Sequence, residues 1–322
     1  MRSMRLATID IGTNTALLLI SEWQDGQLVE LFNASGFVRL GEGLDGSGLV
    51  SEAALLRLET VLRSHMEHIR LFEVAHIIVT GTSASRDAHN SDRIRSLVKL
   101  QTGTDLTILT GDEEAKVTFL GARAGVGASL KDLHGGPGPL EITVVDVGGG
   151  STECVQGPLS SSSKELTFKA SLDMGSVRMT ERYFSQQPAL PSEITKASTA
   201  FRNMLQSELH GAQSTRICVG ASGTARIMAL VHLGLNELPT ATGLASISRL
   251  EMGDWARRLF QMTYNEIMDL HPTKMQGRAD VLPAGALILS EILTFTGSET
   301  LVVSPFGVRH GVAIRYFRES GT

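Results

Sequence analysis

The segment VVDVGGGSTE, residues 144–153, carries the strongest chemical signal in the sequence. Consecutive glycines let a backbone approach an anion closely and direct several N–H groups toward it. Asp146 stands at the end of the preceding apolar run, where a carboxylate suits Mg²⁺, a cation that prefers oxygen ligands. Glu153 is placed to orient a water molecule or to join the metal site. The segment therefore predicts a metal site beside a phosphate cradle, which is formed by Gly148, Gly149, Gly150 and Ser151.

A related pattern occurs near the N-terminus, in IDIGTNT at residues 9–15. In both segments a strand ends in Asp, a small apolar residue and Gly follow, and a polar turn precedes a second strand. Asp10 and the turn Thr13-Asn14 correspond to Asp146 and the triple glycine. This repetition predicts an internal duplication with one copy in each of two domains. The copies would face each other across a cleft, with a cation offsetting the repulsion between the two carboxylates.

Three further segments hold candidate residues. GASGT lies between a predicted strand and a predicted helix, so N–H groups near Ser222 and Gly223 form another anion site. Arg86 follows a buried strand on a loop of small residues, where a guanidinium can clamp a phosphate. Glu113 and Glu114 open a predicted helix. Either carboxylate can activate water as a general base, or both simply complement the helix dipole.

Strands and helices must hold these residues in place, and their mixture along the chain predicts an α/β fold. Residues 5–22 are expected to form two strands joined by a tight turn. Further strands are expected over 27–36, 74–82 and 105–111, and before and after the triple glycine. The predicted helices begin after Ser51 and continue with 92–100, 112–124, 192–208, 248–268 and 283–295. Residues 125–140 are rich in Gly and Pro and are the best candidate for a linker. The serine-rich residues 158–165 are typical of a hairpin tip.

Composition limits the classes of function. The chain has 322 residues, 42% of them hydrophobic and 20% charged, which is typical of a soluble protein with two domains. A net charge of −5 argues against general binding to nucleic acid or membrane surfaces. The N-terminus has no signal-peptide pattern and no stretch is long enough to span a bilayer, so the cytoplasm is expected. A polyanionic ligand would need a local basic groove, for which the candidates are Arg39, Arg178, Lys274 and Arg278.

Several motifs in one order resemble a known family. They are ATIDIGTNT, FVRLGEGL, VTGTSASRDAHN, LTGDEEAKVTFLGA, VVDVGGGSTE, LDMGSVRMTERYF, VGASGT, RADVLPAGALIL and GVRHGVAIRYF. Together they cover almost the whole chain and resemble the exopolyphosphatase / guanosine pentaphosphate phosphohydrolase (Ppx/GppA) family of the acetate and sugar kinase/Hsp70/actin superfamily. The resemblance implies two actin-like (ribonuclease H-like) domains, 1–127 and 128–322, with the helix over 308–322 packing back on the first domain.

The resemblance also implies roles for individual residues. Glu114, the second Glu of the EEA motif, would be the base for the attacking water, and Arg86 would contact phosphate. Mg²⁺ would be the cofactor, held or assisted by Asp10, Asp146 and Glu153. The terminal phosphates would be cradled by Thr13, Asn14, Gly148, Gly149, Gly150 and Ser151.

The implied activity is Mg²⁺-dependent hydrolysis of the terminal phosphoanhydride of inorganic polyphosphate, which releases orthophosphate. Conversion of pppGpp to ppGpp is the first alternative, because it cleaves the same kind of bond. An actin-like kinase and a non-enzymatic sensor of polyphosphate or guanosine tetra- and pentaphosphate are further alternatives. A homodimer is left open. The final loop departs from the family pattern at Pro305 and Phe306, so ligand contacts carried over to that loop are not assigned.

Overall fold

The computed structural model describes residues 4–133, 140–160, 166–238 and 244–321. The chain forms two compact units. Unit 1 consists of Met1–Gly121 together with Val308–Thr322, and unit 2 of Ala122–Gly307. Helix α5 (Gly111–Leu133) begins in unit 1 and ends in unit 2. Within the described residues, no helix combines the length and the apolar character needed to cross a lipid bilayer.

Unit 1 is built on a five-stranded mixed sheet in the order β3-β2-β1-β4-β5. The first three strands are antiparallel neighbours, and β4 and β5 continue parallel to β1. Asp25 and Gly26, both with positive φ, form the tight turn between β2 and β3 that the Asp-Gly pair predicts. The strands are β1 (Arg5–Ile11), β2 (Thr15–Gln24), β3 (Gln27–Phe37), β4 (His76–Gly81) and β5 (Leu106–Ile108).

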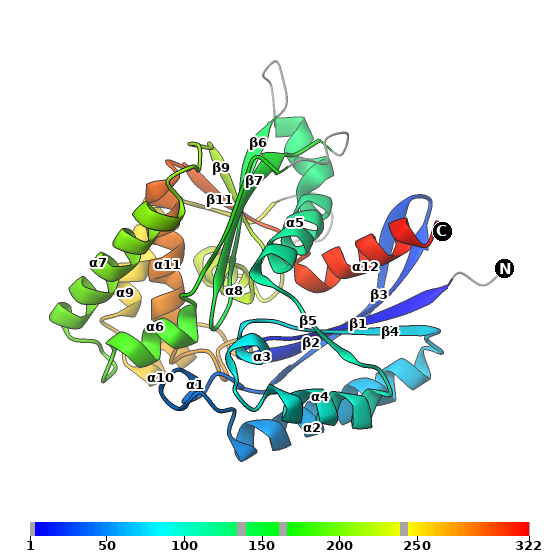
Figure 1. Cartoon of the computed structure of the whole chain (residues 1–322). Helices are drawn as coiled ribbons and strands as arrows, with labels where there is room; N and C mark the ends of the chain where they lie inside the picture. The colour runs from blue at the N-terminus through cyan, green and yellow to red at the C-terminus, as the bar shows by residue number, and fades with distance from the viewer. Residues whose placement is uncertain (1–3, 134–139, 161–165, 239–243, 322) are drawn as a thin grey trace. The chain divides into compact units, whose positions relative to one another are not determined.

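Helices cover both faces of this sheet because β1 is apolar on both sides. Its alternate residues Ala7, Ile9 and Ile11 share a hydrophobic cluster with α2 (Glu52–Leu71), which lies beside α4 (Ser91–Thr102). Leu6, on the opposite face, packs with Phe317 of α12 (Val308–Glu319). Figure 1 shows α12 on one side of the sheet and α2 and α4 on the other. Two short helices, α1 (Leu44–Ser47) and α3 (Ser83–Asp87), complete the unit.

Unit 2 contains a six-stranded mixed sheet in the order β10-β11-β9-β6-β7-β8. Its helix α11 (Leu282–Phe295) is buried along most of its length among α6, α7, α8 and α9, as an all-round apolar sequence predicts. The strands are β6 (Glu141–Val147), β7 (Thr152–Pro158), β8 (Phe168–Leu172), β9 (Ile217–Gly220), β10 (Ser246–Ser248) and β11 (Thr300–Val303). The remaining helices are α6 (Ser176–Tyr183), α7 (Pro191–Glu208), α8 (Gly223–Leu233), α9 (Arg249–Leu259) and α10 (Tyr264–Met268).

The second sheet repeats the first. The series β8-β7-β6-β9-β11 has the same sequence of antiparallel and parallel neighbours as β3-β2-β1-β4-β5. Strand β10 is an addition at the edge of the second sheet. The repeated topology agrees with the duplication that the two Asp-containing strand ends indicate in the sequence.

Two expected features are corrected by the structure. The Gly-rich residues 125–133 are the last turns of α5 rather than a linker, and 134–139 lie outside the described residues. Gly125 allows Phe306 to pack closely on this helix, so the glycine provides a contact surface. The single helix expected over 248–268 is two helices, because Thr263 caps α10 in a reciprocal pair with Glu266. Residues 161–165 of the expected hairpin tip also lie outside the described residues.

The contact between α12 and α5 in unit 1 gives a stability prediction. A Cβ added at Gly311 would overlap the carbonyl oxygen of Val117, so Gly311→Ala is expected to destabilise the protein by about 1–3 kcal/mol through overpacking. Gly127→Ala is the matched control, because a Cβ there has open space and alanine is the better helix former. Thermal unfolding should show a lower Tm for the first variant only. Equal melting temperatures for Gly311→Ala and the wild type would contradict the packing described.

Candidate functional site

The first candidate site lies at the turn between β1 and β2 in unit 1. Gly12 N donates to Thr15 O at 2.9 Å, so the chain reverses over only a few residues, with Thr13 and Asn14 in the turn. The segment after β3 holds this turn, because Gly41 N donates to Thr13 O and Val38 N donates to Asn14 O. Gly41 has no Cβ to collide with the Thr13 methyl group, which allows this close approach.

Unit 2 contains the same construction at the turn between β6 and β7. Gly148 N donates to Ser151 O at 3.0 Å, and the main-chain nitrogens of Val177 and Arg178 both donate to Gly149 O. Gly175 lies against this peptide so closely that a Cβ there would overlap the carbonyl group of Gly149. Sequence reasoning did not single out Gly41 or Gly175, although each stands in a motif downstream of its own turn.

Carboxylates stand beside both turns. Asp10 is 8% exposed at the end of β1, where Thr80 Oγ1 donates to its Oδ1 at 3.3 Å. Asp146 of β6 is paired in register with Glu153 of β7, and Glu153 accepts a 2.9 Å hydrogen bond from Ser171 Oγ. Residues directly opposite in an antiparallel pair point to the same face of the sheet. The two acids of unit 2 therefore form a carboxylate pair on one face.

This carboxylate pair fits a hard divalent cation. Two like charges directly opposite on a sheet repel, and a cation between or beside them removes that repulsion. In the described residues, no three or more His, Cys, Asp or Glu side chains are gathered into a complete metal site. Mg²⁺ commonly uses one or two carboxylates and completes its coordination with waters and substrate phosphates. The donor set of Asp146 and Glu153, or of Asp10, suits this kind of site.

The start of α5 separates the roles of its two glutamates. Glu113 is exposed and bonds back to Thr110, whose main-chain N and Oγ1 donate to Glu113 Oε2 at 2.8 and 2.9 Å. Thr110 Oγ1 in turn accepts from Glu113 N, so this pair caps the helix. Glu114 is only 5% exposed and plays no part in the cap. Capping of the helix therefore accounts for the Glu113 side chain but not for the side chain of Glu114.

Arg86 holds the buried Glu114 carboxylate. Its Nη1 donates to Glu114 Oε2 at 2.6 Å and to Leu109 O at 2.8 Å. Burial raises the pKa of Glu114, whereas the positive charge and hydrogen bond of Arg86 lower it, and the nearby negative charge of Asp87 raises it further. A buried carboxylate with a raised pKa is suited to accept a proton from water. That Arg86 also contacts phosphate stays a prediction.

The candidate residues of the third anion site form a helix start. Ser222 is the N-cap of α8, and its Oγ accepts from Ala225 N at 3.1 Å. Gly223 lies next to the Arg278 guanidinium, which a Cβ at this position would crowd. Burial lowers the pKa of Arg278 to about 10. Capping explains the Ser222 side chain, while the expected phosphate contact at this helix start stays a prediction.

The predicted residues are divided between the two units. Unit 1 contains Asp10, Thr13, Asn14, Arg39, Arg86, Glu113 and Glu114, and the candidates from Asp146 onward belong to unit 2. The expectation that the two turns face each other across a cleft stays a prediction. The Pro305-Phe306 loop has a structural explanation, because Ser304 Oγ accepts from Phe306 N and donates to Ala122 O of α5.

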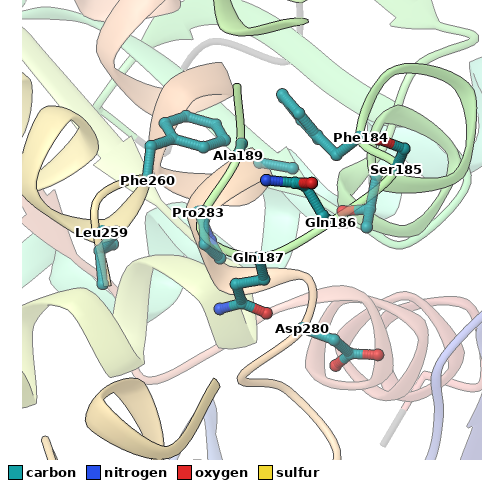
Figure 2. Close-up of a pocket in the computed structure, with 11 residues that line it drawn as sticks. Phe184, Ser185, Gln186, Gln187, Ala189, Leu259, Phe260, Asp280 and Pro283 are labelled. Carbon is teal, nitrogen blue, oxygen red and sulfur yellow. The ribbon is translucent and has the colours of Figure 1, made fainter. Parts of the chain in front are cut away.

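A separate pocket in unit 2 contains none of the predicted residues. It has a volume of about 190 Å³ and lies between the end of α6, the loop that follows, the end of α9 and the start of α11. Figure 2 shows Phe184 and Phe260 with the amides of Gln186 and Gln187 among the residues that line it. The rings of Phe184 and Phe260 lie 4.9 Å apart. This lining is largely apolar and carries no basic side chain for a polyanion.

Comparisons with known proteins show the family and the fold. Residues 19–319 match the Ppx/GppA phosphatase family. Exopolyphosphatase 2 of Mycobacterium tuberculosis (strain CDC 1551 / Oshkosh) is 30% identical over 329 residues, covering 96% of this chain and 98% of that protein. A solved exopolyphosphatase-like protein superposes with a TM-score of 0.88 at 26% identity, with 100% of both chains covered. The Ppx/GppA protein of Aquifex aeolicus superposes with a TM-score of 0.77 at 25% identity, with 99% of both covered. The predicted α/β fold with two actin-like domains is confirmed.

The Arg86–Glu114 pair gives a pH-dependence prediction. Arg86→Gln removes the charge that lowers the pKa of Glu114, so that pKa is expected to rise. A base must be deprotonated to act, so the acid limb of kcat/KM for phosphate release should move to higher pH. Arg95→Gln is the control, because Arg95 also donates to a main-chain carbonyl nearby, that of Leu106 in β5, three residues before Leu109. An acid limb that stays in place or moves to lower pH in Arg86→Gln would show that Arg86 does not set the pKa of the base.

Proposed function

The chain belongs to the Ppx/GppA phosphatase family, and from this premise we propose that it is an exopolyphosphatase. It hydrolyses the terminal phosphoanhydride of inorganic polyphosphate and releases orthophosphate. The observation that carries the proposal is the buried Glu114 carboxylate, held at 2.6 Å by Arg86. A buried, oriented carboxylate with a raised pKa is the general base that hydrolysis by water requires.

The proposed mechanism assigns one task to each group. Main-chain N–H groups of the Thr13-Asn14 turn, and likewise those of the Gly148–Ser151 turn, bind phosphate oxygens of the substrate. Glu114 accepts the proton of the attacking water, and Arg86 holds the Glu114 carboxylate in one orientation. Phosphoryl transfer commonly has a loose transition state, so positioning and charge stabilisation matter more than the strength of the base. Fixed backbone donors and a fixed carboxylate meet that requirement.

Mg²⁺ is the proposed cofactor, with Asp146, Glu153 and Asp10 as its protein ligands or as acceptors of its bound waters. When bound, it would neutralise negative charge on the phosphate oxygens. The carboxylate pair of β6 and β7 supports this assignment, because its repulsion is relieved by a cation. A bound metal would also offset the repulsion between a polyanion and an acidic protein with a net charge of −5.

The second candidate substrate is pppGpp, which contains the same terminal bond. The family name covers both activities, while the M. tuberculosis relative is named for polyphosphate. The proposed backbone contacts would serve the terminal phosphates of either substrate, so the order of the two candidates rests on the name of that relative. We therefore place polyphosphate first and treat pppGpp as a measurable alternative.

One assay tests the proposed function. Phosphate release by the wild type is measured with polyphosphates of several lengths, pppGpp and ATP, each with Mg²⁺ and with EDTA. We expect release from polyphosphate that depends on Mg²⁺. Release from pppGpp alone would replace polyphosphate with the nucleotide, and turnover of ATP only with a small acceptor would indicate a kinase. Full activity in EDTA would remove Mg²⁺ from the proposal.

Two neighbouring glutamates provide a matched test of the base. Glu114→Gln keeps the size and burial of the side chain but removes the proton acceptor, so kcat should fall about 10²–10⁴-fold. Glu113→Gln changes the neighbouring cap residue and should leave kcat close to that of the wild type. Steady-state phosphate release with matched thermal unfolding curves separates lost chemistry from lost folding. Near-normal turnover of Glu114→Gln would show that another group activates the water.

A further inference from the structure

Strand β3 forms the longest sheet edge in the part of the chain that the structure describes. The other three edge strands are short, since β5 and β10 have three residues each and β8 has five. β3 has 11 residues and, among the described residues, pairs with a strand on one side only, that of β2. A long edge offers a row of N–H and C=O groups on which another strand can pair, and a short edge offers few.

β3 also lacks side chains that commonly keep an edge strand from pairing. Lysine and proline serve this purpose in many proteins, and the strand sequence QLVELFNASGF contains no proline and no basic residue. Its one charged side chain, Glu30, is matched by His310 Nε2 of α12 at 3.1 Å. No residue of β3 is fully buried, whereas every residue of β1 after Arg5 is buried. A further strand at this edge would therefore cover apolar surface that the sheet leaves half-exposed.

A bulge divides β3 into two arms of similar length. Leu31 has no partner of its own in β2, because the register shifts on either side of it. In a regular strand, residues three apart point to opposite faces. Across the bulge, however, Asn33 Nδ2 donates to Glu30 Oε1, so these two side chains share the face on which α12 lies. Counted outward from the bulge, the two arms therefore begin on the same face and alternate in step.

This symmetry of the two arms suits pairing with an identical strand. An antiparallel second copy can place its residues 33–36 opposite residues 27–30 of the first, and by symmetry its 27–30 opposite 33–36. Both faces of the sheet then continue across the contact without a change of side. Glu30 of each copy would lie opposite Asn33 of the other, so no like charges are opposed and an amide faces each carboxylate.

The helix that covers this part of the edge adds apolar surface. The end of α2 packs over the centre of β3, where the rings of Phe32 and Phe72 lie 5.4 Å apart. Leu71, the residue before Phe72, is 76% exposed. The exposed leucine thus belongs to the turn of helix nearest the bulge, around which a second copy would be placed. Two copies would bring together the same backbone edge and the same helix end.

We propose that the β3 edge is a self-association surface, on which a second copy of this chain pairs its own β3 in antiparallel orientation to form a twofold dimer. A twofold contact is isologous, because both copies contribute the same groups. The matched arms on either side of the bulge favour an identical strand over an unrelated one. This inference is independent of the proposed function, since no substrate or catalytic residue enters it.

Sedimentation analysis over a wide range of protein concentration tests the association. The wild type should change from the mass of one chain to the mass of two as concentration rises. Ser35→Lys places a charge on the exposed edge and should weaken association about tenfold, because each dimer would hold two such lysines. Ser246→Lys is the matched control on the three-residue edge β10 and should associate like the wild type. Thermal unfolding curves check that both variants are folded.

Cross-linking tests the register. In the double variant Leu28→Cys/Ser35→Cys the new thiols of two copies would lie directly opposite, within reach of a short bifunctional thiol reagent. Within one chain they are about 23 Å apart along the strand, so the reagent should not join them. Cys154 and Cys218 are fully buried and should not react.

A covalent dimer is expected from the double variant and from neither single variant. A wild type that keeps the mass of one chain at every concentration would overturn the proposal. So would a wild-type dimer that Ser35→Lys leaves intact, or a double variant that yields no covalent dimer, since either result places the contact elsewhere.

Discussion

A tight glycine turn at the end of the first strand is the constraint on which both units depend. In unit 1 Gly12 N bonds to Thr15 O, and in unit 2 Gly148 N bonds to Ser151 O. A Cβ at Gly12 or Gly148 would lie 3.3 or 3.0 Å from the same carbonyl oxygen that the turn uses. Because each turn joins two antiparallel strands, its geometry also fixes the register of those strands. It thereby fixes the position of the acid two residues before the glycine, Asp10 in unit 1 and Asp146 in unit 2.

The two copies share a scaffold but have different side chains at equivalent places. Asp146 of β6 faces Glu153, whereas Asp10 of β1 is paired with Leu17, so the carboxylate pair exists only in unit 2. Glu114 and its partner Arg86 belong to unit 1. In the proposed function, duplication supplies two backbone anion sites, while divergence gives the base to unit 1 and the carboxylate pair to unit 2.

Local sequence was sufficient for the parts of the site that depend on local geometry. Three consecutive glycines after an Asp define a turn without any knowledge of the fold, and the sequence placed Asp10 and Asp146 correctly at strand ends. It could not choose between Glu113 and Glu114 from the residues alone, because the choice depends on which side of α5 is buried and on Arg86, 28 positions away. It also predicted a linker over 125–140, of which 125–133 belong to α5, since the packing of Gly125 against Phe306 is a long-range contact.

Both glycine turns are expected to bind phosphate, and amide chemical shifts test this most directly. The Glu114→Gln variant, which should bind without rapid turnover, is titrated with short polyphosphate in Mg²⁺ while the amide signals of Asn14, Gly149 and Gly150 are followed. The predicted result is that signals from both turns shift along one binding curve with a single Kd. Shifts confined to one turn, or absent from both while phosphate release persists in the wild type, would contradict a duplicated phosphate cradle.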